Sequence, residues 1–274
     1  MHSFLFGGGR TAIAAALGLT LVLTACGDDD NNDGGLVGPD GSPSLPTYDQ
    51  LKAALDFAQA QDNKGFGLDM WATVVDRSGI VRAIAFTGDK TGDQWPASRV
   101  ISAQKASTAN SLSLTNLSLA TANLYSAVQP GGSLFGLQES NPVNTDAAYG
   151  GNADDYGTLS DYMIEKRIGG VNVFGGGLAL YDASGEVIGA VGVSGDTSCA
   201  DHSIAWKLRD QLVLDFVPGG VDPASGFDNI VYDIDGNGAS ASGWGHPACP
   251  LVPAEVIAEG QALPTAYPVS PVTP

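Results

Sequence analysis

Positive charge is scarce in this 274-residue sequence, which has 12 Lys and Arg against 30 Asp and Glu and a formal net charge of −18. A protein this acidic repels polyanions, so the composition argues against nucleic acid or an anionic lipid surface as a partner. A P-loop, a dinucleotide-binding glycine pattern and a paired-carboxylate motif are also missing from the sequence. An enzyme acting on a small substrate is therefore only a minor alternative.

No hydrophobic run near the N-terminus is long enough to cross a membrane. The small and apolar run at residues 11–25 is shorter than the about 20 residues that a spanning helix needs, but it matches the hydrophobic region of a signal peptide. It ends in Leu-Thr-Ala-Cys at residues 23–26, which resembles the lipobox of bacterial lipoproteins. We expect cleavage before Cys26, a lipid on Cys26, and an exported protein anchored to a bacterial membrane. Gly27 favours the outer membrane, facing the periplasm. The alternative to a lipoprotein signal is a plain secretory signal followed by a chance cysteine.

The residues directly after Cys26 have no apolar side chains. Residues 27–35 are only Gly, Asp and Asn, so we expect a disordered tether over residues 26–46. Loss of residues 1–25 removes one Arg and no acidic residue, which leaves a formal charge of −19. We expect a single domain over residues 47–264, large enough for a real core, and a disordered tail over residues 265–274.

Cysteine is rare, with three residues in the whole chain. If Cys26 carries lipid, Cys199 and Cys249 remain as an even pair in an oxidising compartment, where a disulfide is the default. The alternative is a metal site built from these two cysteines and two histidines. Their spacing does not resemble a zinc knuckle, which favours the disulfide.

Hydrophobic periodicity predicts an α+β domain. Apolar runs separated by turn residues indicate two hairpins, and runs with helical spacing indicate helices before, between and after them. The predicted helices cover residues 47–58, 97–117 and 201–214, and the predicted strands cover residues 69–76, 80–86, 171–181, 187–193 and 230–234. This order favours an antiparallel sheet covered on one face by helices.

Three segments together resemble a known family. They are WATVVDRSGIVRAIAF at residues 71–86, SRVISAQKASTAN at residues 98–110, and GGLALYDASGEVIGAVGVSGDT at residues 176–197. Their VVD-x-x-G, A-x-K-A-x-T-A and GVSG patterns, in this order, are similar to those of the GlcG/HbpS-like haem-binding family. The resemblance spans roughly residues 48–215.

This resemblance implies a profilin-like or PAS-like domain that is often oligomeric, and haem as a possible cofactor. The chain departs from the short members of the family in its long loop before residue 171. It also continues past the last family helix through GWGHPACP at residues 243–250. The expected disulfide would pin this C-terminal extension to the GVSG turn.

His202 and His246 are the candidate haem ligands, because His2 leaves with the signal peptide. Each lies three residues from one of the paired cysteines, so a disulfide could bring both imidazoles to one pocket. The alternative places His202 in the cap region of a helix and His246 in a structural turn before Pro247.

Other possible haem contacts are better explained by packing. Met70 and Met163 are more typical of core residues than of iron ligands. Tyr149, Tyr156 and Tyr162 lie in or beside the irregular loop, where we expect packing anchors.

Two further patterns have structural explanations. The run from Asp233 to Gly238 resembles half of a calcium loop, but Trp244 occupies the position of the bidentate Glu, so we expect an Asx-rich turn. The GVSGD run at residues 192–196 does not continue as a nucleophile elbow and predicts a tight strand-to-helix turn.

The N-terminal residues and the family resemblance together favour an exported, lipid-anchored module that binds or handles haem and is non-catalytic or at most weakly redox-active. The alternative from another class is a cofactor-free interaction or structural domain of the cell envelope.

Overall fold

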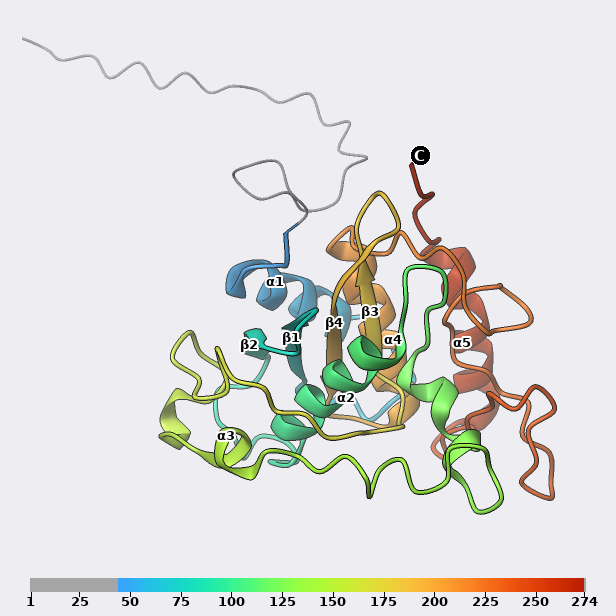
Figure 1. The fold of residues 1–274 in the computed structure, drawn as a ribbon, viewed down its shortest axis with the longest axis horizontal. Helices are drawn as coiled ribbons and strands as arrows, with labels where there is room; N and C mark the ends of the chain where they lie inside the picture. Colours follow the sequence, from blue (N-terminus) through green and yellow to red (C-terminus); the bar gives the residue numbers. More distant parts are fainter. Residues whose placement is uncertain (1–43, 274) are drawn as a thin grey trace, which may run out of the picture. The chain divides into compact units, whose positions relative to one another are not determined.

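A computed structural model describes residues 44–273 of the chain (Figure 1). The expected signal peptide, Cys26 and nearly all of the expected tether lie outside these residues. The first element is α1, Tyr48–Gln59, whose apolar residues at helical spacing are buried. The hydroxyl of Thr47 accepts the amide N–H of Gln50, and the side chain of Gln50 accepts the amide N–H of Thr47. This capping box fixes the start of the helix where the sequence predicts it.

A four-stranded antiparallel sheet forms the centre of the domain, as predicted. Its strands are β1 (Trp71–Asp76), β2 (Val81–Phe86), β3 (Gly177–Tyr181) and β4 (Val187–Ser194), in the order β2-β1-β4-β3. In the register of the sheet, Val74 lies opposite Ala83 on one side and Val191 on the other. The strand predicted from residue 171 begins only at residue 177, because Gly176 has a φ of 110° and interrupts the extended backbone.

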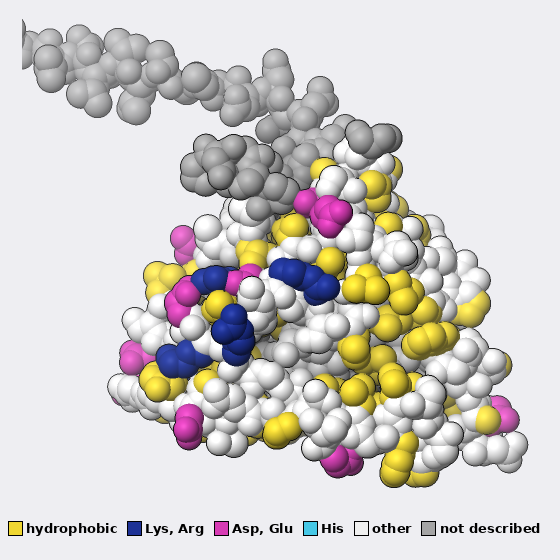
Figure 2. Space-filling model, in the orientation of Figure 1, with side chains coloured by type: hydrophobic (Ala, Val, Ile, Leu, Met, Phe, Trp, Pro, Cys, Tyr) yellow, Lys and Arg dark blue, Asp and Glu magenta, His cyan; other side chains and the backbone are white. Residues whose placement is uncertain are grey.

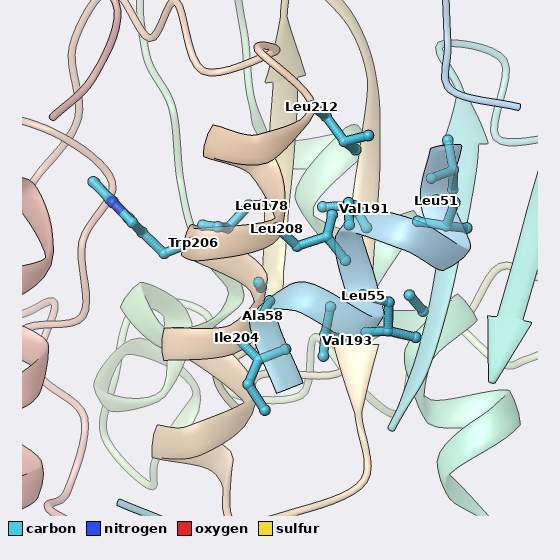
Figure 3. Packing of buried hydrophobic residues seen from close by; sticks show 14 of the residues in the cluster. Leu51, Leu55, Ala58, Leu178, Val191, Val193, Ile204, Trp206, Leu208 and Leu212 are labelled. Atoms are coloured by element: carbon cyan, nitrogen blue, oxygen red, sulfur yellow. The ribbon is translucent and has the colours of Figure 1, made fainter. Parts of the chain in front are cut away.

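Helices cover both faces of the sheet, whereas the sequence predicts one covered face. Helix α2, Ser98–Leu112, crosses one face (Figure 1). Helices α1 and α4, Ser198–Gln211, share a core with the other face (Figure 3). Helix α4 begins three residues earlier than predicted because the hydroxyl of Thr197 accepts the amide N–H of Ala200.

The composition of β4 explains the second covered face. Val191 and Val193 pack into the core with α1 and α4, whereas Ala190 packs into the core with α2. At Gly192 an added Cβ would lie 2.0 Å from the carbonyl oxygen of Ser102, so only glycine allows α2 to approach this closely. The continuous apolar run of β4 is therefore the pattern of a strand buried on both sides.

The long segment between α2 and β3 packs against α2 through a buried ion pair. Arg99 Nη2 lies 2.5 Å from Asp161 Oδ1, and both side chains are almost fully buried. The guanidinium of Arg99 also stacks on the ring of Tyr156, 3.6 Å from its centroid. The segment contains the short helix α3, Thr145–Tyr149, and 3-10 turns at Thr121–Leu124, Ser126–Val128 and Ala153–Asp155.

The C-terminal extension is more ordered than the sequence predicts. It contains α5, Pro253–Ala266, which packs against α4. The tail expected to be disordered from residue 265 instead completes α5 and continues along the domain. The indole N–H of Trp206 donates to the carbonyl of Tyr267 at 3.0 Å, and the amide of Thr273 donates to the carbonyl of Ala183 at 2.9 Å. These bonds satisfy backbone groups of the tail, which explains its order.

The short strand predicted at residues 230–234 is absent from the part of the chain that the structure describes. Only Ile234 takes part in bridge pairing, with Ser240, while the amide of Ile230 donates to a histidine ring. Among the described helices, none is long and apolar enough to cross a membrane.

Candidate ligand cavity

A cavity of about 670 Å³ lies where α2 and α4 begin and where the C-terminal extension passes them. This volume is within the usual range for a small-molecule site. Its apolar walls come from Trp95, Ile101, Tyr125, Phe174, Pro247 and Pro250. Its polar lining comes from Lys105, Ser194, Asp196, Ser198, Asp201 and His246. The cavity thus combines aromatic surface with a small set of convergent polar groups.

The GVSGD turn positions the first turn of α4 beside the cavity. At Gly195 an added Cβ would lie 2.3 Å from the carbonyl oxygen of Asp69, so the turn needs glycine to pass this close. The carboxylate of Asp196 accepts the amide N–H groups of Phe66 and Leu68, at 2.9 and 3.2 Å. The turn is therefore fixed to the loop before β1.

His246 has both ring nitrogens engaged at the cavity. Nδ1 lies 2.7 Å from the carbonyl oxygen of Pro247, and because a carbonyl only accepts, Nδ1 carries the proton. The unprotonated Nε2 then accepts the hydroxyl of Ser198 at 2.8 Å. Burial is the main cause that lowers the pKa of His246 to about 4, and the neighbouring ammonium of Lys105 lowers it further. The imidazole is therefore neutral at pH 7, in a fixed tautomer.

The predicted disulfide holds His246 in this place. Cys199, in the first turn of α4, is bonded to Cys249 with an S–S distance of 2.07 Å, which confirms the pairing. Ser198 directly precedes Cys199 and His246 lies three residues before Cys249, so the bridge brings their side chains together. The carbonyl of Gly245 also accepts the hydroxyl of Ser126 at 2.6 Å.

A buried ion pair that the sequence does not predict also lines the cavity. Lys105 Nζ lies 2.6 Å from Asp201 Oδ2 and donates to the carbonyl of Val193 at 2.9 Å. Burial raises the pKa of Asp201 to about 6, an effect that Lys105 only partly opposes, and burial also lowers the pKa of Lys105. The available sequence signal was Lys105, which stands among small residues on the inner side of a predicted helix. Its partner Asp201 lies on another helix, so the sequence alone does not indicate the pair.

His202 lies one helical turn after Ser198 and does not line the cavity. Its ring is fully buried, and the amide of Ile230 donates to Nε2 at 3.1 Å. Nδ1 is buried with no hydrogen-bond partner among the described residues. Burial lowers the pKa of His202 to about 3. Of the two predicted ligands, the structure therefore places only His246 at the cavity.

The remaining candidates occupy structural positions. Met70 and Met163 are fully buried in the core, as predicted. Tyr156 lies in the long loop and packs against the core that contains α2, as predicted for an anchor, whereas Tyr149 is 63% exposed and serves as no anchor. In the predicted Asx turn, the carboxylate of Asp235 accepts two backbone amides, at 2.8 and 2.9 Å.

Comparisons with known proteins give a match to one family model and to one curated protein. The family model described as "Haem degrading protein HbpS-like" matches residues 47–209. An uncharacterized 15.0 kDa protein in the dhaT-dhaS intergenic region of Citrobacter freundii is 33% identical over 162 residues, which cover 58% of this chain and 89% of that protein.

Two solved structures are also similar. A crystal structure of a PduOC:heme complex is 25% identical, covers 61% of this chain and 94% of its own, and has a TM-score of 0.42. The crystal structure of Klebsiella pneumoniae protein ORFY is 28% identical, covers 65% of this chain and 97% of its own, and has a TM-score of 0.40. The match of the family model over more than half of the sequence shows that this chain belongs to the HbpS-like family.

Proposed function

We propose that the domain binds haem in this cavity, with His246 as the ligand to the iron. The observation that carries the proposal is the fixed neutral tautomer of His246, in which Nδ1 holds the proton and Nε2 keeps a lone pair for a ligand bond. This lone pair points toward Ser198, and both residues line the cavity. Membership of the HbpS-like family supports haem as the ligand.

The residues around the cavity fit this cofactor. Metal-binding histidines commonly donate the second ring N–H to a backbone carbonyl, as Nδ1 of His246 does toward Pro247. The aromatic walls, among them Trp95 and Phe174, offer apolar surface suited to a porphyrin. Iron ligation requires the hydroxyl of Ser198 to give up its bond to Nε2. Bound haem iron supplies redox and oxygen chemistry, while the chain binds and orients the group.

His202 is left out of this proposal. Its Nε2 accepts a backbone amide and its ring is fully buried away from the cavity, so ligation there requires a rearrangement of α4 and the extension. The sequence hypothesis of two histidines at one haem is thus reduced to one.

We also propose that the chain is exported and anchored through lipid on Cys26, in the outer membrane facing the periplasm. The lipobox-like residues 23–26 and the Gly, Asp and Asn tether support this location. A disulfide between Cys199 and Cys249 is consistent with an oxidising compartment.

A hemin titration of residues 44–274, followed by absorbance, tests the haem proposal. We expect saturable one-to-one binding that His246→Gly abolishes and that added imidazole restores, because the glycine leaves space for a free ligand. Tyr149→Phe, at an exposed tyrosine, is the matched control and should bind like wild type. Binding that survives His246→Gly without imidazole would refute the ligand, and no saturable binding at all would favour a cofactor-free interaction domain.

A further inference from the structure

The cations of this acidic domain are unevenly paired. Seven of the eleven Lys and Arg residues among the described residues form an ion pair with a carboxylate. The four that do not are Arg77, Lys90, Lys166 and Arg167. Arg77 and Arg167 line one hollow, and Lys166 is adjacent in sequence. On the face drawn in Figure 2, the Lys and Arg side chains gather in a single area.

This hollow has a volume of about 460 Å³ and lies between the β1–β2 turn, the last turns of α2 and the end of the long loop. Besides the two arginines its side chains come from Ser78, Ser107, Asn110 and Ser111, and glycines complete it. None of its lining residues is acidic or apolar. The formal charge of the protein is −18, but the described residues that line this hollow include two cations and no carboxylate, a composition suited to an anion.

The two guanidinium groups are held in place by backbone carbonyls. Arg167 Nε donates to the carbonyl of Ser78 at 2.8 Å, and its two terminal nitrogens have no acceptor among the described residues. Arg77 donates to the carbonyls of Asn110 and Ser113 at the end of α2. These carbonyls form the negative end of the helix dipole, so Arg77 offsets the field that would oppose an anion there.

Hydroxyl groups add further donors. The hydroxyls of Ser78, Ser107 and Ser111 line the hollow and make no hydrogen bond with any described residue. A phosphate group has several acceptor oxygens, carries up to two charges, and matches a planar guanidinium with surrounding hydroxyls better than a single carboxylate does.

We propose that this hollow binds a phosphate group. A soluble phosphate compound is the expected source, because the acidic charge of the whole protein repels an anionic lipid surface, and a lipid headgroup is tested as the other source. The site is separate from the haem cavity. Helix α2 lines the cavity with residues up to Lys105 and the hollow with residues from Ser107 to Ser111, so the two sites use different parts of the helix. The inference therefore does not depend on the proposed haem binding.

Calorimetric titration of residues 44–274 with inorganic phosphate, at low ionic strength, tests the proposal. We expect saturable binding that Arg167→Gln weakens by about tenfold or more, because it removes a charge-assisted bidentate contact. Lys90→Gln is the matched control, because it removes an equally unpaired and exposed charge outside the hollow. Ser111→Asp places a carboxylate at an exposed position of the hollow and should abolish binding while the melting temperature stays close to wild type.

Sedimentation with phosphatidylglycerol vesicles identifies the source of the phosphate group. Co-sedimentation that Arg167→Gln abolishes and Lys90→Gln preserves would assign a lipid headgroup, whereas binding of inorganic phosphate without co-sedimentation would assign a soluble compound. Absence of saturable phosphate binding, or equal weakening by Arg167→Gln and Lys90→Gln, would overturn the proposal.

Discussion

Single residues decide which histidine can serve the cavity. Positions 198 and 202 are one turn apart on α4, yet Ser198 lines the cavity and His202 is enclosed by the extension near Ile230. The sequence correctly predicts that His202 and His246 each lie close along the chain to one cysteine of the disulfide. It could not give the packing that separates the two rings, because that depends on contacts with residues about 28 positions away.

His202 should make the stability of the domain depend on pH. Its folded pKa of about 3 lies below the unfolded value of 6.5, so the unfolded state takes up a proton first as the pH falls. The stabilisation by a neutral His202 is fully present above pH 6.5 and is lost toward pH 3. Between pH 7 and pH 4.5, urea unfolding of wild type should lose about 2 kcal/mol more than that of His202→Asn. Other titrating groups, including Asp201, are shared by both proteins, and an equal loss in both would contradict this assignment.

Elements with regular patterns were predictable, and irregular ones were not. The four strands follow from apolar runs around turns such as Arg77-Ser78-Gly79. Helix α5 was missed because Gly260 and Pro264 interrupt its pattern. Gly260 is required by packing, since an added Cβ would lie 2.8 Å from the ring of Tyr232. Local propensity gives no sign of such a contact with a distant segment.

The extension supplies one wall of the cavity, and the disulfide joins it to α4. Replacing both Cys199 and Cys249 by Ala should lower the free energy of unfolding by about 2–5 kcal/mol. It should also weaken hemin binding, because the segment around His246 loses its covalent link to the first turn of α4. Chemical denaturation and hemin titration of the double variant, beside wild type treated with a thiol reductant, measure both effects. Unchanged hemin affinity in both samples would contradict this prediction. It would show that the hydrogen bonds of His246 are sufficient to hold the segment around it without the disulfide.

At the scale of the whole molecule, the expected anchor determines where the domain works. Cys26→Ser should move the protein from the membrane fraction to the soluble fraction of the cell envelope, because lipid is then no longer attached. Thr24→Ala keeps a small residue in the lipobox-like segment and is the matched control. Fractionation followed by mass spectrometry of the N-terminus measures the outcome. Membrane association that persists in Cys26→Ser would refute the lipid anchor.

Iron ligation by His246 is best tested by the hemin affinities of two single variants, one at Ser198 and one at His246, whose side chains are hydrogen-bonded to each other. Ser198→Ala frees Nε2 of His246 from a hydrogen bond worth about 1 kcal/mol. The Kd of this variant for hemin should therefore fall roughly fivefold below that of wild type. His246→Ala removes the ligand, so saturable binding should be lost. Equal affinities in the two variants, or weaker binding in Ser198→Ala than in His246→Ala, would contradict iron ligation by His246.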